Sequence, residues 1–196
     1  GAPRNKAYRT VNARRARKNW KVIVEEPEDK VIDNVQIVGG HLVITSLKDV
    51  SAHMEIRKLG GKVVREVPLP GIGASFGMTG NPDEDTAYYS FMSYTTPTQI
   101  YETSIKKGDA TLWTEIKLPI DASPYEVELV RYPSKVGTEV SMFIVHRKDM
   151  PRDGSTPMQL YGYGGFQISM RPYFSSTLYP WLEAGGAYAV PHLRGG

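Results

Sequence analysis

A glycine-rich run with two tyrosines is the segment of this sequence best suited to chemistry. Residues 161–166 read Tyr-Gly-Tyr-Gly-Gly-Phe and follow a short segment, residues 158–161, that is typical of a buried strand. Three glycines in four positions allow the backbone to approach another group closely, and the tyrosines add phenol donors. Glycine-rich loops at strand ends form oxyanion holes in acyl-transfer enzymes. The alternative is a tight turn with Tyr163 as surface cover.

A second run matches a catalytic motif in its residue types but not in its predicted structural context. Residues 73–77 read Gly-Ala-Ser-Phe-Gly, the G-x-S-x-G pattern in which Ser75 would be a nucleophile between a strand and a helix. Here a strand-like sequence and an acidic turn at residues 81–85 follow, and no helix is predicted. We therefore interpret Ser75 as a serine on an inner strand.

The histidines and acidic residues carry weaker signals. His41, His53, His146 and His192 show no metal-ligand spacing, so we expect no metal site, and no motif indicates a cofactor. His146 ends a predicted strand and should be half exposed. His192 follows the last predicted strand, where packing or hydrogen bonding is its preferred role. The acids at residues 83–85 are interpreted as a solvated turn, because the rest of a calcium-loop pattern is absent.

Composition limits the class of protein. The 196 residues are 40% hydrophobic and 23% charged, near the globular average, and the absence of cysteine excludes disulfides and thiolate sites. No apolar run approaches the ~18 residues of a membrane span, so we expect no membrane partner. Both the cytoplasm and the periplasm remain open. A basic cluster within residues 14–21 could bind phosphate, but a solvated turn is preferred, and we expect no nucleic-acid partner.

Short strands dominate the chain before about residue 120. Apolar segments separated by glycine turns predict a four-stranded antiparallel meander, and the pattern recurs about 45 residues later, a spacing typical of propeller blades. Blades bury their faces on neighbouring blades, and residues 7–24 could supply the outer strands of a preceding one. The predicted strands lie at residues 35–38, 41–45, 54–57 and 63–67, and then at 75–78, 88–91, 100–103 and 111–113.

A different pattern begins after about residue 123. Two strands, near residues 127–130 and 140–145, precede the short strand before the glycine-rich loop. A helical pattern over residues 174–182 is interrupted by Pro180, so the helix either kinks or begins there, and a strand at 187–190 follows. Strand, helix and strand in this order predict a βαβ unit with a parallel sheet, as at the opening of an α/β domain.

The order and spacing of several runs resemble those of prolyl oligopeptidases, serine peptidases that cut short peptides after proline. The Gly-Gly-Phe at residues 164–166 is specific, since related oligopeptidases that cut after basic residues carry a different loop. The similarity covers essentially the whole chain. The matching runs are residues 132–135, 142–148, 160–166 and 193–196, with blade sequences at 1–3, 47–49, 69–71 and 93–97.

The resemblance implies a β + α/β architecture. Residues 1–123 correspond to the last blades of a seven-bladed β-propeller, which covers the active site, and residues 124–196 to the first part of an α/β-hydrolase domain. By position, Tyr163 should donate its phenol O–H to the oxyanion of the tetrahedral intermediate. Phe166 should line the pocket that holds the substrate proline. Arg194 and the glycines after it belong to a loop that we interpret as structural.

The family's catalytic serine, aspartate and histidine lie downstream of the Arg-Gly-Gly run and have no counterpart here. An oxyanion donor without a nucleophile and a base does not make a peptidase. We therefore expect the complete protein to be a proline-specific oligopeptidase and this chain alone to be inactive. Its expected partners are short proline-containing peptides and the remainder of the same enzyme. The alternatives are a non-enzymatic partial-propeller binding module and a related oligopeptidase or acylaminoacyl-peptidase of different specificity.

Overall fold

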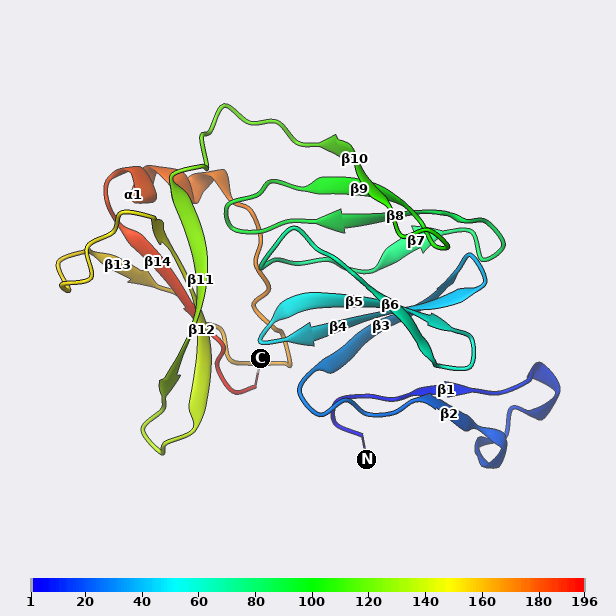
Figure 1. Ribbon diagram of the computed structural model, residues 1–196. Coiled ribbons are helices and arrows are strands. Elements are labelled where there is room, and N and C mark those ends of the chain that lie inside the picture. Colours follow the sequence, from blue (N-terminus) through cyan, green and yellow to red (C-terminus); the bar gives the residue numbers. More distant parts are fainter. Residues whose placement is uncertain (1, 196) are drawn as a thin grey trace. The chain divides into compact units, whose positions relative to one another are not determined.

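The computed structural model describes residues 2–195 and divides into two compact units (Figure 1). The first unit comprises Gly1–Gly71, Ser75–Phe91 and Ile100–Thr114. The second comprises Ile72–Ala74, Met92–Gln99 and Glu115–Gly196. In the described part of the chain, no helix is long and apolar enough to cross a membrane.

Two four-stranded sheets, each built from consecutive strands, form most of the first unit. The first sheet is antiparallel throughout, which confirms the first predicted meander. In the second sheet consecutive strands are neighbours, as predicted, and β7 pairs antiparallel with β8. The first sheet contains β3 (Val31–Val38), β4 (His41–Lys48), β5 (Ser51–Lys58) and β6 (Val63–Val67) in that order. The second contains β10 (Ala110–Glu115), β9 (Gln99–Ser104), β8 (Thr86–Phe91) and β7 (Met78–Gly80) in that order.

One predicted strand of the second sheet lies later than expected. Strand β7 begins at Met78, whereas the sequence pattern placed a strand over residues 75–78. Gly77 has φ +114°, outside the region of extended strands, and this conformation delays the start of regular pairing. Ala74 makes only an isolated bridge to Met92.

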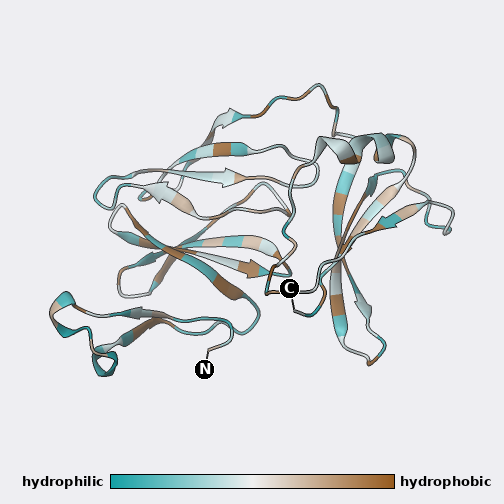
Figure 2. Cartoon of the chain, turned by 180° about the vertical axis from the view of Figure 1, so that it is seen from behind, coloured by the Kyte–Doolittle hydropathy of each residue, from teal (hydrophilic) through white to brown (hydrophobic). Residues whose placement is uncertain are grey.

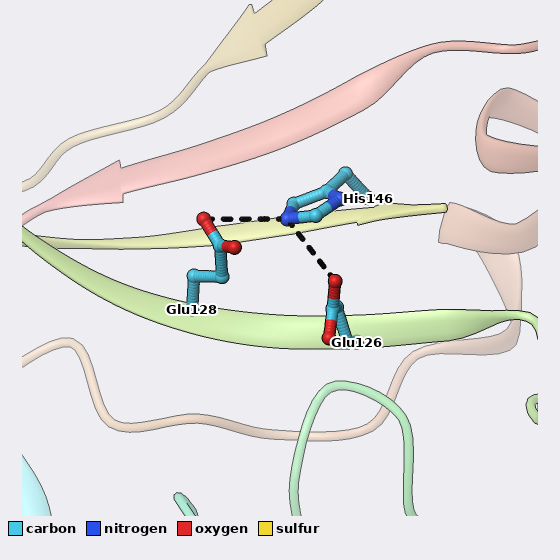
Figure 3. A group of neighbouring side chains, drawn as sticks. All are labelled: Glu126, Glu128 and His146. Atoms are coloured by element: carbon cyan, nitrogen blue, oxygen red, sulfur yellow. Dashed lines mark ion pairs between the residues drawn. The ribbon is translucent and has the colours of Figure 1, made fainter. Parts of the chain in front are cut away.

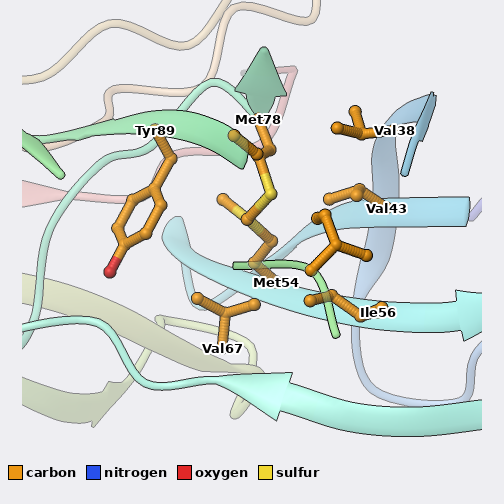
Figure 4. Packing of buried hydrophobic residues seen from close by; sticks show 9 residues of the cluster. Val38, Val43, Met54, Ile56, Val67, Met78 and Tyr89 are labelled. Carbon is orange, nitrogen blue, oxygen red and sulfur yellow. The ribbon is translucent and has the colours of Figure 1, made fainter. Parts of the chain in front are cut away.

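A hydrophobic cluster joins strands of both sheets (Figure 4). Val43 of β4 belongs to this cluster, while its neighbours Leu42 and Ile44 belong to a second cluster with Ala7 and Val24. Successive side chains point to opposite faces of a strand, so both faces of β4 are covered. The first cluster comprises Val38, Val43, Met54, Ile56, Val67, Met78, Ala87, Tyr89 and Ile105.

The second cluster lies under a hairpin formed by β1 (Ala7–Arg9) and β2 (Lys21–Val24). The connection between these strands carries the basic cluster, and Figure 2 shows it as mostly hydrophilic. It contains two short 3₁₀ turns, η1 (Asn12–Arg14) and η2 (Arg17–Asn19), in which no residue is buried. The Trp20 indole donates to the carbonyl of Arg15 over 2.9 Å. These contacts agree with a solvated turn.

A charged side chain, Glu55 of β5, is buried in the first unit. Its carboxylate accepts hydrogen bonds from Lys30 and, over 2.6 and 2.9 Å, from Arg57. Burial alone raises the pKa of Glu55, but the hydrogen bonds from Lys30 and Arg57 outweigh it and leave that pKa below its ordinary value. The side chain is therefore an ionised member of a structural ion cluster.

The second unit is built on one mixed four-stranded sheet with the order β11-β12-β14-β13. Strands β11 (Tyr125–Pro133) and β12 (Glu139–Arg147) form a long antiparallel hairpin, and β12 pairs antiparallel with β14 (Ala187–Pro191). Strand β13 (Met158–Leu160) pairs parallel with β14. The parallel pair expected from the strand, helix and strand pattern is confirmed.

The helix between β13 and β14 is shorter than the helical pattern suggested. A 3₁₀ turn, η3 (Ser176–Leu178), leads into α1 (Tyr179–Glu183), in which Pro180 occupies the first turn. Proline lacks a backbone donor and is tolerated only there, so the second of the two expectations, a helix beginning near Pro180, is correct. Tyr179 and Leu182 of α1 are buried.

Candidate functional site

The glycine-rich loop begins where strand β13 ends. The amide of Tyr161 donates to the carbonyl of Ala189 over 2.9 Å, which extends the parallel pairing by one residue. Beyond this point the chain leaves the sheet at the carboxyl end of a parallel strand. In open α/β sheets this is the edge at which ligands bind.

The loop glycines are needed because a second segment, residues 193–195, lies against them. A Cβ on Gly162 would approach the Leu193 side chain to 2.8 Å, and one on Gly164 would approach the Arg194 carbonyl to 2.9 Å. Real Cβ atoms do not come this close, so position 164, which meets backbone, requires glycine, whereas at position 162 the end of the Leu193 side chain would have to shift. The amide of Gln167 also donates to the Gly195 carbonyl over 2.8 Å. The close approach inferred from the sequence thus joins two backbone segments.

Arg194, in the loop that was interpreted as structural, makes one side-chain hydrogen bond to a distant segment. Its guanidinium donates to the hydroxyl of Thr138 over 2.9 Å, and the side chain is otherwise exposed. The segment that supports the glycine-rich loop is therefore linked in turn to the connection between β11 and β12.

The two predicted site residues lie on the exposed side of this loop. Tyr163 is 37% exposed and Phe166 is 90% exposed. Phe166 and Gln167 have φ of +55° and +58°, a left-handed conformation that is strained for residues other than glycine. Such strain costs of order 1–3 kcal/mol per residue and gathers at functional sites. No sequence pattern predicted this strained pair.

Ser75 is buried but lies outside any strand, so the expectation of an inner-strand position is wrong. Ser75 is 0% exposed, and the element that follows it is strand β7, which begins three residues later. A nucleophile elbow requires an exposed hydroxyl at the start of a helix. The rejection of the G-x-S-x-G match is confirmed.

The prediction that His146 is half exposed is wrong, because the residue is only 1% exposed. Strand β12 lies between β11 and β14, and both Val145 and His146 are buried, so both faces of its end are covered. The structure also brings His146 close to Glu126 and Glu128.

His192 has the hydrogen-bonding and packing role that was preferred for it. Its Nδ1 lies 2.7 Å from the Ser141 hydroxyl, and its ring centroid lies 4.5 Å from that of Phe143.

A tyrosine-rich pocket in the second unit was not predicted. Its volume is about 220 Å³. Burial raises the pKa of Tyr188 to about 12 and that of Tyr94 still further above the ordinary value. These phenols stay neutral at physiological pH, so they can donate hydrogen bonds but cannot act as bases. The pocket is lined by Tyr94, Gln159, Tyr173, Ser175, Thr177, Leu178 and Tyr188.

Comparison with known proteins identifies the family. A sequence model of the prolyl oligopeptidase N-terminal β-propeller domain matches residues 1–116, more than half of the chain. The chain belongs to the prolyl oligopeptidase family. The expected β-propeller character of the first unit is therefore confirmed. The match to the propeller ends at residue 116, so it does not extend to residues 124–196.

Members of the prolyl oligopeptidase family with different names resemble this chain along most of its length. The prolyl endopeptidase of Elizabethkingia miricola is 36% identical over 195 residues, which cover 100% of this chain and 27% of the relative. Dipeptidyl aminopeptidase BI of Pseudoxanthomonas mexicana is 34% identical over 185 residues, 92% of this chain and 25% of the relative. The chain thus spans about a quarter of the length of these relatives.

Solved structures of this family give the same picture. One, from a study of two prolyl endopeptidases and the role of inter-domain dynamics, has a TM-score of 0.94 and 49% identity, covering 100% of this chain and 29% of its own. Prolyl oligopeptidase B of Galerina marginata, bound to a 25mer macrocyclization substrate, has a TM-score of 0.88 over 100% of this chain and 28% of its own. At 24% identity, the second comparison supports the fold alone.

Proposed function

We propose that the complete protein is a serine oligopeptidase that hydrolyses short peptides on the carboxyl side of proline. The supporting observation is the loop at residues 161–166, which presents an exposed phenol and an exposed, strained phenylalanine from a backbone fixed by its neighbour. A fixed donor stabilises a developing oxyanion without reorganising during the reaction. A site built on rigid backbone also keeps the pocket wall in place.

In this proposal Tyr163 donates its phenol O–H to the oxyanion of the tetrahedral intermediate. The donor acts only as the carbonyl oxygen gains negative charge, so it stabilises the transition state more than the bound substrate. Phe166 lines the apolar pocket for the substrate proline. The nucleophile, the general base and the acid that orients it come from the rest of the enzyme.

The proposed architecture assigns residues 1–123 to the last blades of a seven-bladed propeller and residues 124–196 to the start of an α/β-hydrolase domain. The parallel pair of β13 and β14, with α1 between them, supports the second assignment. A partner for the propeller part is suggested by β10, whose six residues are all exposed. Leu112 and Trp113 of this strand are 46% and 63% exposed, and the remainder of the enzyme would cover them.

The test is a substrate series with the complete protein. Chromogenic peptides that differ only in proline, alanine or lysine before the scissile bond measure specificity, and the same proline sequence within a folded protein measures the size limit. Efficient cleavage of only the short proline peptide is expected. Equal cleavage of the lysine peptide, or cleavage of the folded substrate, would contradict the proposal. The chain of 196 residues alone should give no turnover.

One relative supports a second candidate specificity, the removal of dipeptides. Dipeptidyl aminopeptidase BI is about as similar to this chain as the prolyl endopeptidases are. Removal of dipeptides from a free amino terminus, in place of internal cleavage after proline, would favour this alternative. An acetylated and a free form of the same peptide distinguish the two activities.

A further inference from the structure

A buried histidine faces two carboxylates on the hairpin of β11 and β12 (Figure 3). His146 comes from β12, and Glu126 and Glu128 come from β11, where Glu126 is directly opposite His146 in the strand register. One ligand atom from each of the three residues lies within 4.8 Å of the other two. The imidazole is 1% exposed, whereas the two carboxylate side chains are 41% and 29% exposed, so the cluster opens to solvent on its acidic side.

The other ring nitrogen determines which tautomer faces the glutamates. Nδ1 of His146 is 2.6 Å from the carbonyl oxygen of Arg147, and only a protonated Nδ1 can donate to that oxygen. The neutral ring therefore presents the Nε2 lone pair to Glu126 and Glu128. An imidazole that donates its other N–H to a backbone carbonyl is the arrangement usual for metal-binding histidines.

Nε2 and the two carboxylates face one another at distances longer than a hydrogen bond. Nε2 makes no hydrogen bond within residues 2–195, and the nearest oxygens of Glu128 and Glu126 lie at 3.5 and 4.0 Å. A proton on Nε2 would draw a carboxylate to the roughly 2.7–3.2 Å of a hydrogen bond. Ligands around a tetrahedral Zn²⁺ are separated by roughly 3.3–3.6 Å, from metal–ligand distances of about 2.0–2.2 Å. The Nε2–Glu128 separation of 3.5 Å falls within this range, whereas Glu126, at 4.0 Å, would have to move closer to share the ion.

Glu128 is held in position by a further residue. Arg152 donates to its two oxygens over 2.5 and 3.2 Å. A ligating carboxylate is normally oriented by hydrogen bonds from outside the metal's own ligands. Arg152 orients Glu128 in this way.

We propose that Glu126, Glu128 and His146 form a binding site for a divalent transition metal of the Zn²⁺ class, with a fourth ligand position open to solvent. A nitrogen and two carboxylate oxygens are ligands that Zn²⁺ accepts. The ion would tie β11 to β12 across the register and stabilise the hairpin. This site is separate from the peptidase proposal, since its test measures metal binding and not hydrolysis.

The experiment is calorimetric titration of Zn²⁺ into chelator-stripped protein that contains the full chain. His146 is buried, and its replacement could unfold the sheet, so Glu126→Gln and Glu128→Gln test the site with little change in volume. Glu139→Gln, an exposed position on the same strand as His146, is the matched control. The wild type and the control should bind one ion at this site. Each site variant should bind at least about 10-fold more weakly, a loss already produced by removing an outer partner of a metal ligand.

Thermal unfolding and Co²⁺ substitution provide independent measurements. Zn²⁺ should raise the Tm of the wild type and the control, and Co²⁺ should give visible absorption bands that both site variants lose. Absence of binding in the wild type, or equal binding and equal spectra in all four proteins, would overturn the proposal. Equal binding would assign the ion to another part of the molecule.

Discussion

Replacing Phe166 with alanine separates a pocket residue from a packing residue. In the complete enzyme, Phe166→Ala should lower kcat/KM for proline substrates by about 10–200-fold, the ~1–3 kcal/mol expected when an apolar pocket loses complementarity. An otherwise identical substrate with alanine in place of proline should be affected less, because its side chain fills less of the pocket.

The stability change should be small. Truncating a fully buried phenylalanine costs about 3–5 kcal/mol. Phe166 is 90% exposed, so about a tenth of that loss applies, on the order of 0.3–0.5 kcal/mol. The melting temperature of Phe166→Ala should therefore stay close to that of the wild type.

Two comparison variants set the scale. Phe143→Ala removes a phenylalanine that is 0% exposed and should cost the full 3–5 kcal/mol or so. Val136→Ala removes an exposed side chain in the turn after β11 and should change neither kinetics nor stability. Normal proline kinetics with a clearly lower Tm for Phe166→Ala would refute the pocket assignment and place the residue in a core.

Two further predictions concern stability. Glu55→Gln should lower the free energy of unfolding by ~3 kcal/mol at neutral pH, the low end for breaking a buried ion pair, because its two basic partners keep partial exposure. Because the folded pKa lies below the ordinary value of 4.5, this contribution is complete above pH 4.5 and is lost as the pH falls through the folded pKa. Urea titrations of both proteins should therefore converge in acid, and a difference that persists there would contradict the assignment. Gly186→Ala, whose Cβ would lie 2.2 Å from the Trp181 ring, should cost about 1–3 kcal/mol, whereas Gly60→Ala, in open space, should be nearly neutral. Equal Tm values for the two glycine variants would show that the Trp181 ring yields freely.

Strand order in the first unit could be predicted because its turns and apolar alternation are local features. Glycine pairs separate β3 from β4 and β5 from β6, and other turn residues, an Asn-Pro-Asp run and a Lys-Gly-Asp run, separate β7 from β8 and β9 from β10. The parallel pair of β13 and β14 could also be predicted, since a short strand, a helical segment and a second strand have few alternative arrangements.

The features that could not be predicted depend on contacts between distant segments. His146 is buried because both faces of the end of β12 are covered, and the spacing of 18 or 20 residues to its glutamates has no motif. The strained backbone of Phe166 arises where residues 193–195 contact its loop. Neither effect is visible in local propensity, because each is set by the tertiary arrangement.

Tyr163→Phe in the complete enzyme tests the proposed oxyanion role most directly, because it removes one hydroxyl and keeps the ring. Loss of one oxyanion donor typically lowers kcat by roughly 10²–10³. The measurement is kcat and KM for a proline amide substrate, for which formation of the tetrahedral intermediate limits the rate, together with Tm. We predict that kcat falls by roughly this factor, with a smaller change in KM and an unchanged Tm. A kcat within a few-fold of wild type would contradict the account and remove Tyr163 from the mechanism.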